Sequence, residues 1–425
     1  METVIKIYAI IGTVFSLLYL YQAIFIIIPF IKKHKPHKET VIHKIGVLIS
    51  ARNESAVISQ LIDSINNQDY PQDSLTVFVV ADNCTDNTAE ISRKHGAVVY
   101  ERFNKEKVGK GYALNFLLKN IEKDYHDSPF DAFIVLDADN ILEPNYVTEM
   151  NKTFSDGYQI VTSYRNSKNY GDSWISAGYA LWFLRESKYL NNSRMLTNTS
   201  CAIGGTGFLF SRSICEKYNG WNFFLLTEDI EFTIQNVIDG EKIGFCPDAV
   251  LYDEQPTTLK QSWKQRLRWS KGFLQVCSKY GTTLAKNIFT RKFTSCADMM
   301  LIIIPCIVSV ISAFAFAITL IVAIAIGSSL IPIALWLLRG ALLSYAWMFF
   351  IGFVTTITEW KNIHSSAFKK IIYMFTFPIF LATYIPITIE AFFKKVEWTP
   401  IIHSKSNTIK EIRSENRKEP DAQSF

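Results

Sequence analysis

Paired cysteines are the first feature that this chain lacks. Its seven cysteines are scattered without regular spacing, and no two of them form a CxxC pair. An odd, scattered set argues against a disulfide framework and favours a reduced, cytosolic setting for the middle of the chain. A strong excess of charge is missing too, because the formal net charge is +5 over 425 residues. Since much of this small excess flanks apolar stretches, it points to a membrane surface rather than to nucleic acid.

Charge is also absent from the whole stretch between Ile7 and Ile31. That length can span a bilayer and exceeds the core of a signal peptide, and no small-residue cleavage site is obvious. Basic residues follow at once between Lys32 and Lys38. By the positive-inside rule they place the N-terminus outside and the next domain in the cytoplasm. Residues 1–42 are therefore predicted to form an uncleaved transmembrane anchor with a basic flank.

Two further apolar stretches lie in the last third of the chain. Residues 299–358 are too long for one helix and contain a natural turn at Gly327, so they are predicted to form a transmembrane hairpin. Residues 359–403 include a marginally long apolar stretch that Pro378 and Pro386 would break. This part is predicted to be re-entrant or interfacial rather than a crossing. The polar residues 404–425 are predicted to be a disordered tail on the cytoplasmic side.

The middle of the chain, residues 43–272, alternates apolar β-rich runs with amphipathic helical patterns. Runs such as VFVV at 77–80 and FIVL at 133–136 are continuously apolar, which suits strands covered on both faces. Strands that alternate with helices predict an α/β domain with a mainly parallel sheet. Residues 273–298, which mix basic, aromatic and apolar side chains, are predicted to lie along the bilayer surface.

Carboxylates close two of the apolar runs. Asp137 and Asp139 follow FIVL, and two carboxylates one residue apart can address one Mg²⁺ or Mn²⁺ that also binds a diphosphate. The alternative is a solvated acidic turn. Asp82 ends the run VFVVA and could accept the N–H of a uracil ring, or it could cap the next helix. Asn53 and Glu54, after the first run, admit the same two interpretations.

Two glycine-rich turns could approach a ligand. Lys110 lies in the turn Gly109–Gly111 before a helical pattern, where a helix N-terminus and a lysine favour phosphate. The spacing of a Walker A loop is missing. Glycines at 204, 205 and 207 would let the backbone approach a ligand closely, although a tight turn explains them equally well.

The last motifs precede the apolar hairpin. In TED at 227–229, a carboxylate could remove the proton of a sugar hydroxyl, and the alternative is ordinary N-capping of a helix. In QRLRW at 265–269, Gln265 and Trp269 share a helical face with Arg268 beside them. A Trp face stacks on a sugar ring, and Arg and Gln grip phosphate or hydroxyls. The alternative is a basic amphipathic helix that rests on lipid.

The order of these motifs resembles the family 2 glycosyltransferases of the membrane-embedded, polysaccharide-synthase kind. Such enzymes include hyaluronan, chitin, cellulose and poly-N-acetylglucosamine synthases, and ADNCTDNT, GKGYAL, LTEDIEF and DEQPTT resemble the bacterial exopolysaccharide transferases most. The resemblance implies a Rossmann-like GT-A fold with N- and C-terminal transmembrane helices, an inverting mechanism and a need for Mn²⁺ or Mg²⁺. One departure is Asp82-Asn83-Cys84, where many relatives have Asp-Gly-Ser.

The resemblance also implies roles for individual residues. Asp229 is the expected base, and Asp139 is the expected metal ligand. The expected donor-nucleotide site contains Ala51, Asn53, Glu54, Asp82, Lys110, Asp137 and Asp139. The expected acceptor and diphosphate site contains Gly205, Thr206, Gly207, Glu228, Gln265, Arg268 and Trp269.

The expected reaction transfers a sugar from a UDP-sugar, such as UDP-N-acetylglucosamine or UDP-glucose, to a growing β-linked exopolysaccharide at the cytoplasmic membrane face. The alternative within enzymes is a glycolipid synthase that transfers one sugar to a membrane lipid. A third interpretation is an inactive sugar-nucleotide sensor. Because only three spans are predicted firmly, a pore for a polymer would need an auxiliary membrane subunit or a homodimer.

Overall fold

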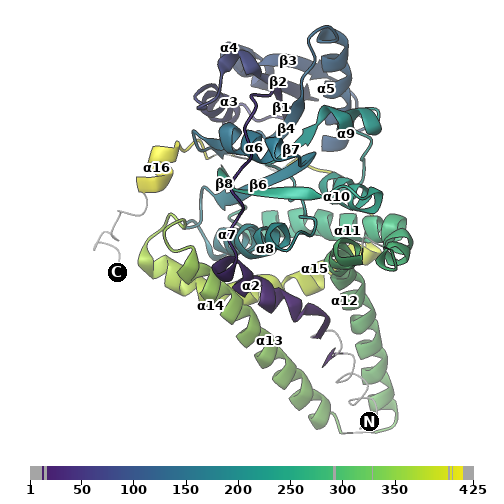
Figure 1. Cartoon of the computed structure of the whole chain (residues 1–425). Coiled ribbons are helices and arrows are strands. Elements are labelled where there is room, and N and C mark those ends of the chain that lie inside the picture. The colour runs from purple at the N-terminus through teal and green to yellow at the C-terminus, as the bar shows by residue number, and fades with distance from the viewer. Residues whose placement is uncertain are drawn as a thin grey trace.

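The computed structural model describes residues 12–13, 17–290, 293–327, 329–400, 403 and 405–414. An eight-stranded sheet with helices on both faces lies above a layer of helices, and two long helices extend away from that layer (Figure 1). The strands are β1 (Ile45–Ala51), β2 (Leu75–Asp82), β3 (Val98–Arg102), β4 (Ala132–Asp137), β5 (Ile141–Leu142), β6 (Ile160–Ser167), β7 (Phe208–Ser211) and β8 (Ile243–Asp253).

The sheet has the order β3-β2-β1-β4-β7-β6-β8-β5. The first four strands in this order run parallel, so their carboxyl ends meet at one edge. β7 is antiparallel to β4 and β6, β8 returns parallel to β6, and β5 is antiparallel to β8. The predicted mainly parallel α/β sheet is therefore confirmed, and its parallel half carries the strand ends where ligands of such folds bind.

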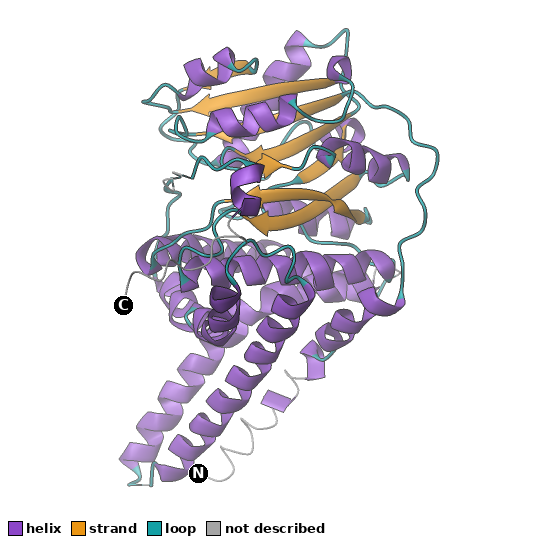
Figure 2. Cartoon of the chain, turned by 90° about the vertical axis from the view of Figure 1, so that its left-hand side faces the viewer, coloured by secondary structure: helices purple, strands orange, loops and turns teal. Residues whose placement is uncertain are grey.

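Helices cover both faces of the sheet, as Figure 2 shows from the side. They are α3 (Ile58–Asn66), the 3₁₀ turn η1 (Gln72–Ser74), α4 (Thr88–Lys94), α5 (Lys110–Asp124), α6 (Tyr146–Ser155), α7 (Trp174–Arg185), the π-helical η2 (Glu186–Asn191), α8 (Asn192–Leu196), α9 (Arg212–Lys217) and α10 (Glu228–Asp239). Ile58 and Leu61 of α3 and Met150 of α6 are fully buried in the core of one face. Leu114 of α5 belongs to the core of the other face, which continues down to Phe377 of α14.

Helix boundaries follow local signals near the site. α7 begins with a capping box, in which the Ser173 hydroxyl accepts the Ser176 N–H (3.2 Å) and the Ser176 hydroxyl accepts the Ser173 N–H (3.0 Å). α10 ends at Gly240, whose φ of 94° is the left-handed conformation that glycine adopts without strain. These two helices deliver the side chains that lie between the sheet and the membrane helices.

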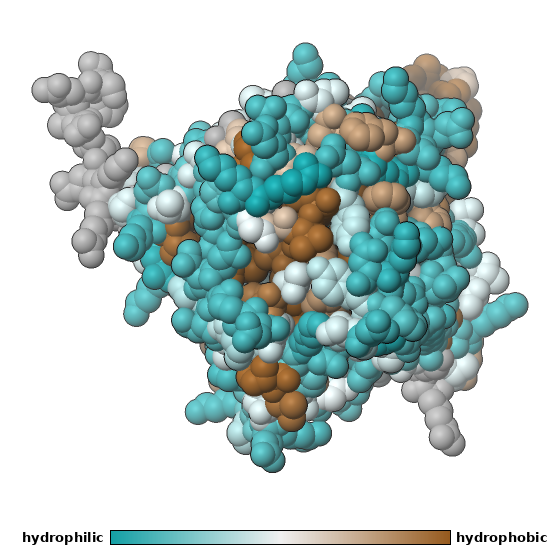
Figure 3. All heavy atoms as spheres, turned by 90° about the horizontal axis from the view of Figure 1, so that it is seen from above, coloured by the Kyte–Doolittle hydropathy of each residue, from teal (hydrophilic) through white to brown (hydrophobic). Residues whose placement is uncertain are grey.

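The helices on the membrane side are α2 (Tyr21–Ile31), α11 (Leu259–Ile288), α12 (Phe293–Ala325), α13 (Ile331–Thr358), α14 (Ala367–Ala382) and α15 (Tyr384–Phe393). Three segments of the described chain are long and apolar enough to cross a membrane: α12, α13, and α14 together with α15. Within the expected N-terminal anchor, Leu17–Ile31 form a shorter apolar helix, and residues 1–11 and 14–16 lie outside the described residues. The anchor itself stays a prediction. The face of the molecule that lies away from the long helices is seen from above the sheet in Figure 3. This face is mostly hydrophilic, with hydrophobic side chains in a central hollow.

The segment that was expected to be broken by prolines is helical on both sides of Thr383. Pro378 lies inside α14, and the interruption falls at Thr383. The buried Arg266 of α11 donates from Nη1 to the carbonyl of Phe380 (3.0 Å) and to Oγ1 of Thr383 (2.7 Å). Pro386 is the third residue of α15 and has no N–H to donate to the Ala382 carbonyl four residues before it, so the interruption at Thr383 follows from this proline. The interfacial placement of residues 359–403 stays a prediction.

The polar tail departs from the expectation of disorder in its described part. Residues 409–414 form α16 (Ile409–Ser414). Ile412 is fully buried, and Arg413 Nη2 contacts both carboxylate oxygens of Glu143 at 2.7 Å. Composition alone does not predict this helix, because Glu143, which Arg413 contacts, lies 270 residues away in the sequence. Residues 415–425 lie outside the described part.

Candidate active site

One cavity of about 620 Å³ runs from the strand ends of the sheet to the membrane helices. Its walls come from β1, β2 and β4 at one end and from α2, α12, α13 and α15 at the other. The expected site residues that line it are Glu54, Asp82, Lys110, Asp137, Asp139, Gly205, Glu228, Asp229, Gln265, Arg268 and Trp269. Acidic residues that are far apart in the sequence therefore line the same cavity.

Asp82, the last residue of β2, is buried and already has a basic neighbour. Nη1 of Arg102, on the adjacent strand β3, forms an ion pair with Asp82 Oδ1. The Asn83 side chain also donates to Oδ1 at 3.1 Å. Asn83 has φ 53°, a left-handed conformation that asparagine tolerates better than most residues, which explains how it replaces glycine in this turn. The Asp82 carboxylate is therefore held in place at the cavity wall.

Three hydrogen bonds tie the end of β4 to the glycine turn. Lys110 forms an ion pair with Asp137 and donates to the Gly205 carbonyl at 2.8 Å. The Thr206 hydroxyl accepts the Asp137 N–H (2.9 Å) and donates to Oδ1 of Asn140 (2.5 Å). Burial lowers the pKa of Lys110, but the charges of Asp137 and its acidic neighbours outweigh burial and leave that pKa raised. A permanent positive charge therefore lies where a diphosphate would need one.

Asp139 is buried beside a segment that returns from the membrane helices. Its Oδ2 accepts the Glu254 N–H at 2.9 Å, and the His403 ring nitrogen Nδ1 lies 3.0 Å from both oxygens of Glu54. Burial lowers the pKa of His403, but Asp139 and Glu54 raise it to about 10. Trp398 lies under the guanidinium of Arg52, 5.3 Å from ring centroid to Cζ. The negative charges of Asp139 and Glu54 therefore favour the protonated form of the His403 ring at this end of the cavity.

Glu228 and Asp229 begin α10 at the centre of the cavity. The expected capping by Thr227 is absent, because its side chain makes no cap hydrogen bond and its Oγ1 is buried without a partner among the described residues. Burial, reinforced by the charge of Asp229, raises the pKa of Glu228 to about 7. Burial also raises the pKa of Asp229. A carboxylate with a raised pKa can take a proton near neutral pH.

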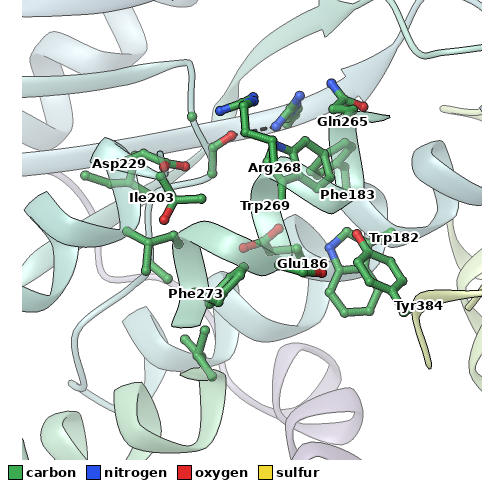
Figure 4. A pocket seen from close by; sticks show the side chains of 18 of the residues that line it. Trp182, Phe183, Glu186, Ile203, Asp229, Gln265, Arg268, Trp269, Phe273 and Tyr384 are labelled. Atoms are coloured by element: carbon green, nitrogen blue, oxygen red, sulfur yellow. Dashed lines mark hydrogen bonds between the residues drawn. The ribbon is translucent and has the colours of Figure 1, made fainter. Parts of the chain in front are cut away.

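The QRLRW motif lies on α11 and faces the same space (Figure 4). Arg268 Nη1 donates to the Leu226 carbonyl at 2.7 Å and so fixes the loop before α10. The Trp269 ring meets Tyr179 and Phe183 edge-on, with centroid distances of 5.8 Å and 6.4 Å. Oε1 of Gln265 is buried with no partner in the described part of the chain. The motif therefore offers a ring face and an unused acceptor atom to a ligand.

Four expected site residues are not among those that line the cavity in the described structure: Ala51, Asn53, Thr206 and Gly207. Asn53 Oδ1 accepts the Thr85 N–H at 2.8 Å, so this side chain orders the neighbouring loop. A Cβ at position 207 would approach Leu251 to 2.1 Å, and φ there is 67°, so glycine is required for packing. Direct binding by these four residues stays a prediction.

Other lining residues were not expected from the sequence. These residues are Arg165, Trp182, Glu186, Tyr384 and His403. They come from β6, α7, η2, α15 and the C-terminal segment. No local motif marks them, because each is an isolated residue in a helix, strand or loop whose pattern is explained by packing.

Comparisons with known proteins decide the family. The model of the family described as "Glycosyltransferase like family 2" matches residues 43–272, more than half of the chain. The chain belongs to this family. The expected family membership and the expected GT-A fold are thereby confirmed.

Relatives within the family differ in the reactions that their names state. The chain is 30% identical over 258 residues to the "Probable glycosyltransferase YdaM" of Bacillus subtilis (strain 168), which covers 56% of this chain and 57% of that protein. It is 27% identical to the beta-monoglucosyldiacylglycerol synthase of Nostoc sp. (strain PCC 7120), with coverages of 58% and 53%. It is 24% identical to a poly-beta-1,6-N-acetyl-D-glucosamine synthase of Staphylococcus epidermidis, with coverages of 58% and 60%. The chain thus spans little more than half the length of these curated relatives.

A solved structure shares the fold over nearly the whole chain. The mannosyltransferase PcManGT from Pyrobaculum calidifontis, solved with GDP-Man and Mn²⁺, matches with a TM-score of 0.57 and 17% identity. The match covers 92% of this chain and 99% of that one. The likeness extends beyond the family domain into the helices on the membrane side.

Proposed function

We propose that this chain transfers a sugar from a UDP-sugar to an acceptor hydroxyl at the cytoplasmic face of the cell membrane, with inversion at the anomeric carbon. The observation that carries the proposal is the single cavity that joins the strand-end carboxylates, Asp229 and Trp269 to the membrane helices. A donor in water and an acceptor near lipid could reach Asp229 from opposite ends of this space. The membrane association rests on three helices long enough to span a bilayer.

The donor half of the cavity fits a nucleoside diphosphate. Asp82 would accept the uracil N–H, and its ion pair with Arg102 orients the carboxylate. Lys110 would turn from Asp137 toward the diphosphate. Arg268, at the far side of Asp229, would meet the same phosphates. These assignments give every charge of the leaving nucleotide a partner of opposite sign or a hydrogen bond.

The same half fits a divalent cation that is shared with the donor. Among the described residues no group of three His, Cys, Asp or Glu side chains could enclose a metal by itself. Mg²⁺ and Mn²⁺ are often held by one or two carboxylates together with substrate phosphates, and Asp139 and Asp137 offer that set. When bound, the metal would offset the charge of the departing diphosphate. Metal dependence is thus part of the proposal.

Asp229 would act as the base. It would take the proton of the acceptor hydroxyl while that oxygen forms a bond to the anomeric carbon and the bond from this carbon to the diphosphate oxygen breaks. UDP would leave with the bonding electrons, and attack from the face opposite the diphosphate inverts the carbon. Trp269 would present its face to the acceptor, and Gln265 would bind a hydroxyl with its unpartnered Oε1.

Two acceptors are supported by different observations. A growing β-linked exopolysaccharide fits the relatives named poly-beta-1,6-N-acetyl-D-glucosamine synthase, and an auxiliary membrane subunit or a second copy would then complete its exit path. A membrane lipid fits the relatives named beta-monoglucosyldiacylglycerol synthase and the apolar inner walls, which include Leu301, Trp347 and Ile385. The chemistry at Asp229 is the same for both.

The test is turnover by the full chain in lipid nanodiscs. Labelled UDP-glucose, UDP-N-acetylglucosamine and, as a contrast, GDP-mannose are each supplied with Mn²⁺ or Mg²⁺, and the products are separated by size and by solubility in organic solvent. A UDP-sugar should give either a polymer ladder or a single glycolipid. Transfer only from GDP-mannose would contradict the proposed donor. Equal release of UDP by wild type and Asp229→Asn would support an inactive sensor instead.

A further inference from the structure

One carboxyl in the inner half of the cavity has no part in the reaction proposed above. Glu186 lines the cavity, and among the described residues no side chain or backbone group forms a hydrogen bond or an ion pair with its carboxylate. Burial raises the pKa of this carboxyl, and the charges of Arg194, Arg165 and Arg185 oppose the shift. Glu186 is half-buried and lines the cavity, so its carboxylate oxygens are available to a ligand that enters this space.

The arginines near Glu186 are committed to other partners. Arg165 Nε donates to Asp253 at 2.6 Å, and its Nη1 donates to the Gly204 carbonyl at 2.5 Å. Arg194 Nε and Nη2 bind the two oxygens of Asp298 at 2.6 Å and 3.1 Å. Arg185 Nη2 donates to Gln22 at 2.5 Å. Glu186 therefore keeps its oxygens open to the cavity in a positively charged surrounding.

The backbone also places Glu186 where the helix geometry changes. It is the first residue of η2, the π-helical continuation of α7. Single-turn π-helical segments are rare and often occur at functional sites. The change of geometry reorients the side chains that follow Trp182 and Phe183, and both of these aromatic residues line the same cavity.

Two consecutive glycines lie beside Glu186 and the expected base. A Cβ at Gly204 would lie 3.8 Å from Glu186 Oε2, and a Cβ at Gly205 would lie 3.6 Å from Asp229 Oδ2. The turn therefore runs past both carboxylates without a side chain of its own, and Arg165 Nη1 lies 3.7 Å from the same Cβ position at Gly204. In Figure 4, Glu186 lies between Asp229 on one side and Trp182 with Tyr384 on the other.

We propose that Glu186 binds the acceptor, by accepting hydrogen bonds from hydroxyl groups adjacent to the one that Asp229 deprotonates. Neighbouring hydroxyls on one ring or one glycerol backbone could reach the two carboxylates together, while the aromatic rings cover the apolar face of the acceptor. A carbohydrate chain and a lipid head group both present such hydroxyls. This inference rests on the proposed function. In it, Glu186 is the residue that selects a polyol acceptor over water.

The test compares Glu186→Gln with wild type in nanodiscs, using the UDP-sugar that the wild type turns over. Two acceptor probes are titrated separately: a β-linked N-acetylglucosamine trisaccharide and dioleoylglycerol. Glu186→Gln keeps the size of the side chain but removes the charge, so the acceptor KM should rise about tenfold, in line with the loss of one charge-assisted hydrogen bond. The Kd of UDP with Mn²⁺ and the kcat at saturating acceptor should change less than about twofold. The probe whose KM rises identifies the acceptor.

Two further variants test whether a change in the acceptor KM comes from the contact between Glu186 and the acceptor. Gly204→Ala places a methyl group beside Glu186 Oε2 without strain, because its backbone lies outside the left-handed region, and it should raise the acceptor KM in the same way. Glu216→Gln, on the exposed helix α9, is the matched control and should leave all constants unchanged. An unchanged acceptor KM in both Glu186→Gln and Gly204→Ala, or an equal loss of UDP binding, overturns this inference alone. A wild type that transfers from no UDP-sugar overturns the proposed function as well.

Discussion

The half of the cavity that faces the strand ends is charged, whereas the half that reaches between the helices is mostly apolar. The charged half is built from consecutive positions after β1, β2 and β4, and its acids have basic neighbours such as Arg102 and Lys110. The apolar half is built from helices that are far apart in the chain, with Glu186 as an unpaired acid. Under the proposed function, donor recognition would therefore depend on local motifs, and acceptor recognition would depend on how the helices pack around Asp229.

Replacement of the expected base should give the largest difference between the effect on turnover and the effect on UDP binding. Asp229→Asn removes the proton acceptor, so kcat should fall by about 10²–10⁴-fold, the usual contribution of a positioned base. The donor half does not need this group, so UDP binding with Mn²⁺ should stay within about twofold of wild type. Turnover is measured by UDP release and binding by calorimetry. A parallel loss of UDP binding would count against the assignment.

Asp139→Asn should damage the donor half alone. Because one oxygen of Asp139 is held by the Glu254 N–H, the substitution preserves the shape of the loop but removes the charge that would face the cation. The Kd of UDP in the presence of Mn²⁺ should rise about 10–100-fold, and added Mn²⁺ should no longer strengthen binding. Calorimetry with and without the metal checks this. Full metal dependence in the variant would refute the role.

Trp269→Ala should damage the acceptor half more than the donor half. The ring contributes about 1–1.5 kcal/mol of aromatic contact, so the acceptor KM should rise about tenfold. Trp269→Phe is the matched variant, because it keeps the edge-on contacts with Tyr179 and Phe183. If alanine lowers the melting temperature and weakens UDP binding as much as acceptor binding, the Trp is structural.

The pH profile should give the smallest and most specific effect. The base must be ionised, and burial raises the pKa of Asp229, so kcat/KM should rise with pH through a region above the usual pKa range of an aspartate. Glu228→Gln removes the neighbouring negative charge, which lets Asp229 lose its proton more easily. The acid limb of the profile should therefore move to lower pH. A limb that stays in place would show that another group controls the rate.

The donor half could largely be foreseen from the chain. Strand-end carboxylates such as Asp82 and Asp139 follow continuous apolar runs, and parallel strands bring their carboxyl ends to one edge. The contacts that these residues make with other elements of the fold could not be foreseen from the chain. Thr206, for example, links the end of β4 to the glycine turn through its hydroxyl, a contact that the sequence did not reveal, and its expected contact with a ligand stays a prediction.

The acceptor half could be foreseen only in part. Trp269 was marked by its motif, but Glu186 and Tyr384 have no pattern of their own, because helices of any function bury occasional polar and aromatic residues. Of the two prolines expected to break the third apolar segment, Pro378 lies inside α14, whereas the interruption at Thr383 precedes Pro386 by three residues. The contact of Arg266 with the carbonyl of Phe380 at this point could not be foreseen. Similarly, α16 depends on the contact of Arg413 with Glu143, which no local composition encodes.

A structure of the full chain in a lipid nanodisc, determined with UDP and Mn²⁺, tests the central claim most directly. The account predicts density for the uracil at Asp82 and for the diphosphate between Asp139, Lys110 and Arg268, with the inner half of the cavity still open to the membrane helices beside Asp229 and Glu186. UDP bound elsewhere, or bound in this cavity without contact to Asp82 and Asp139, would contradict it.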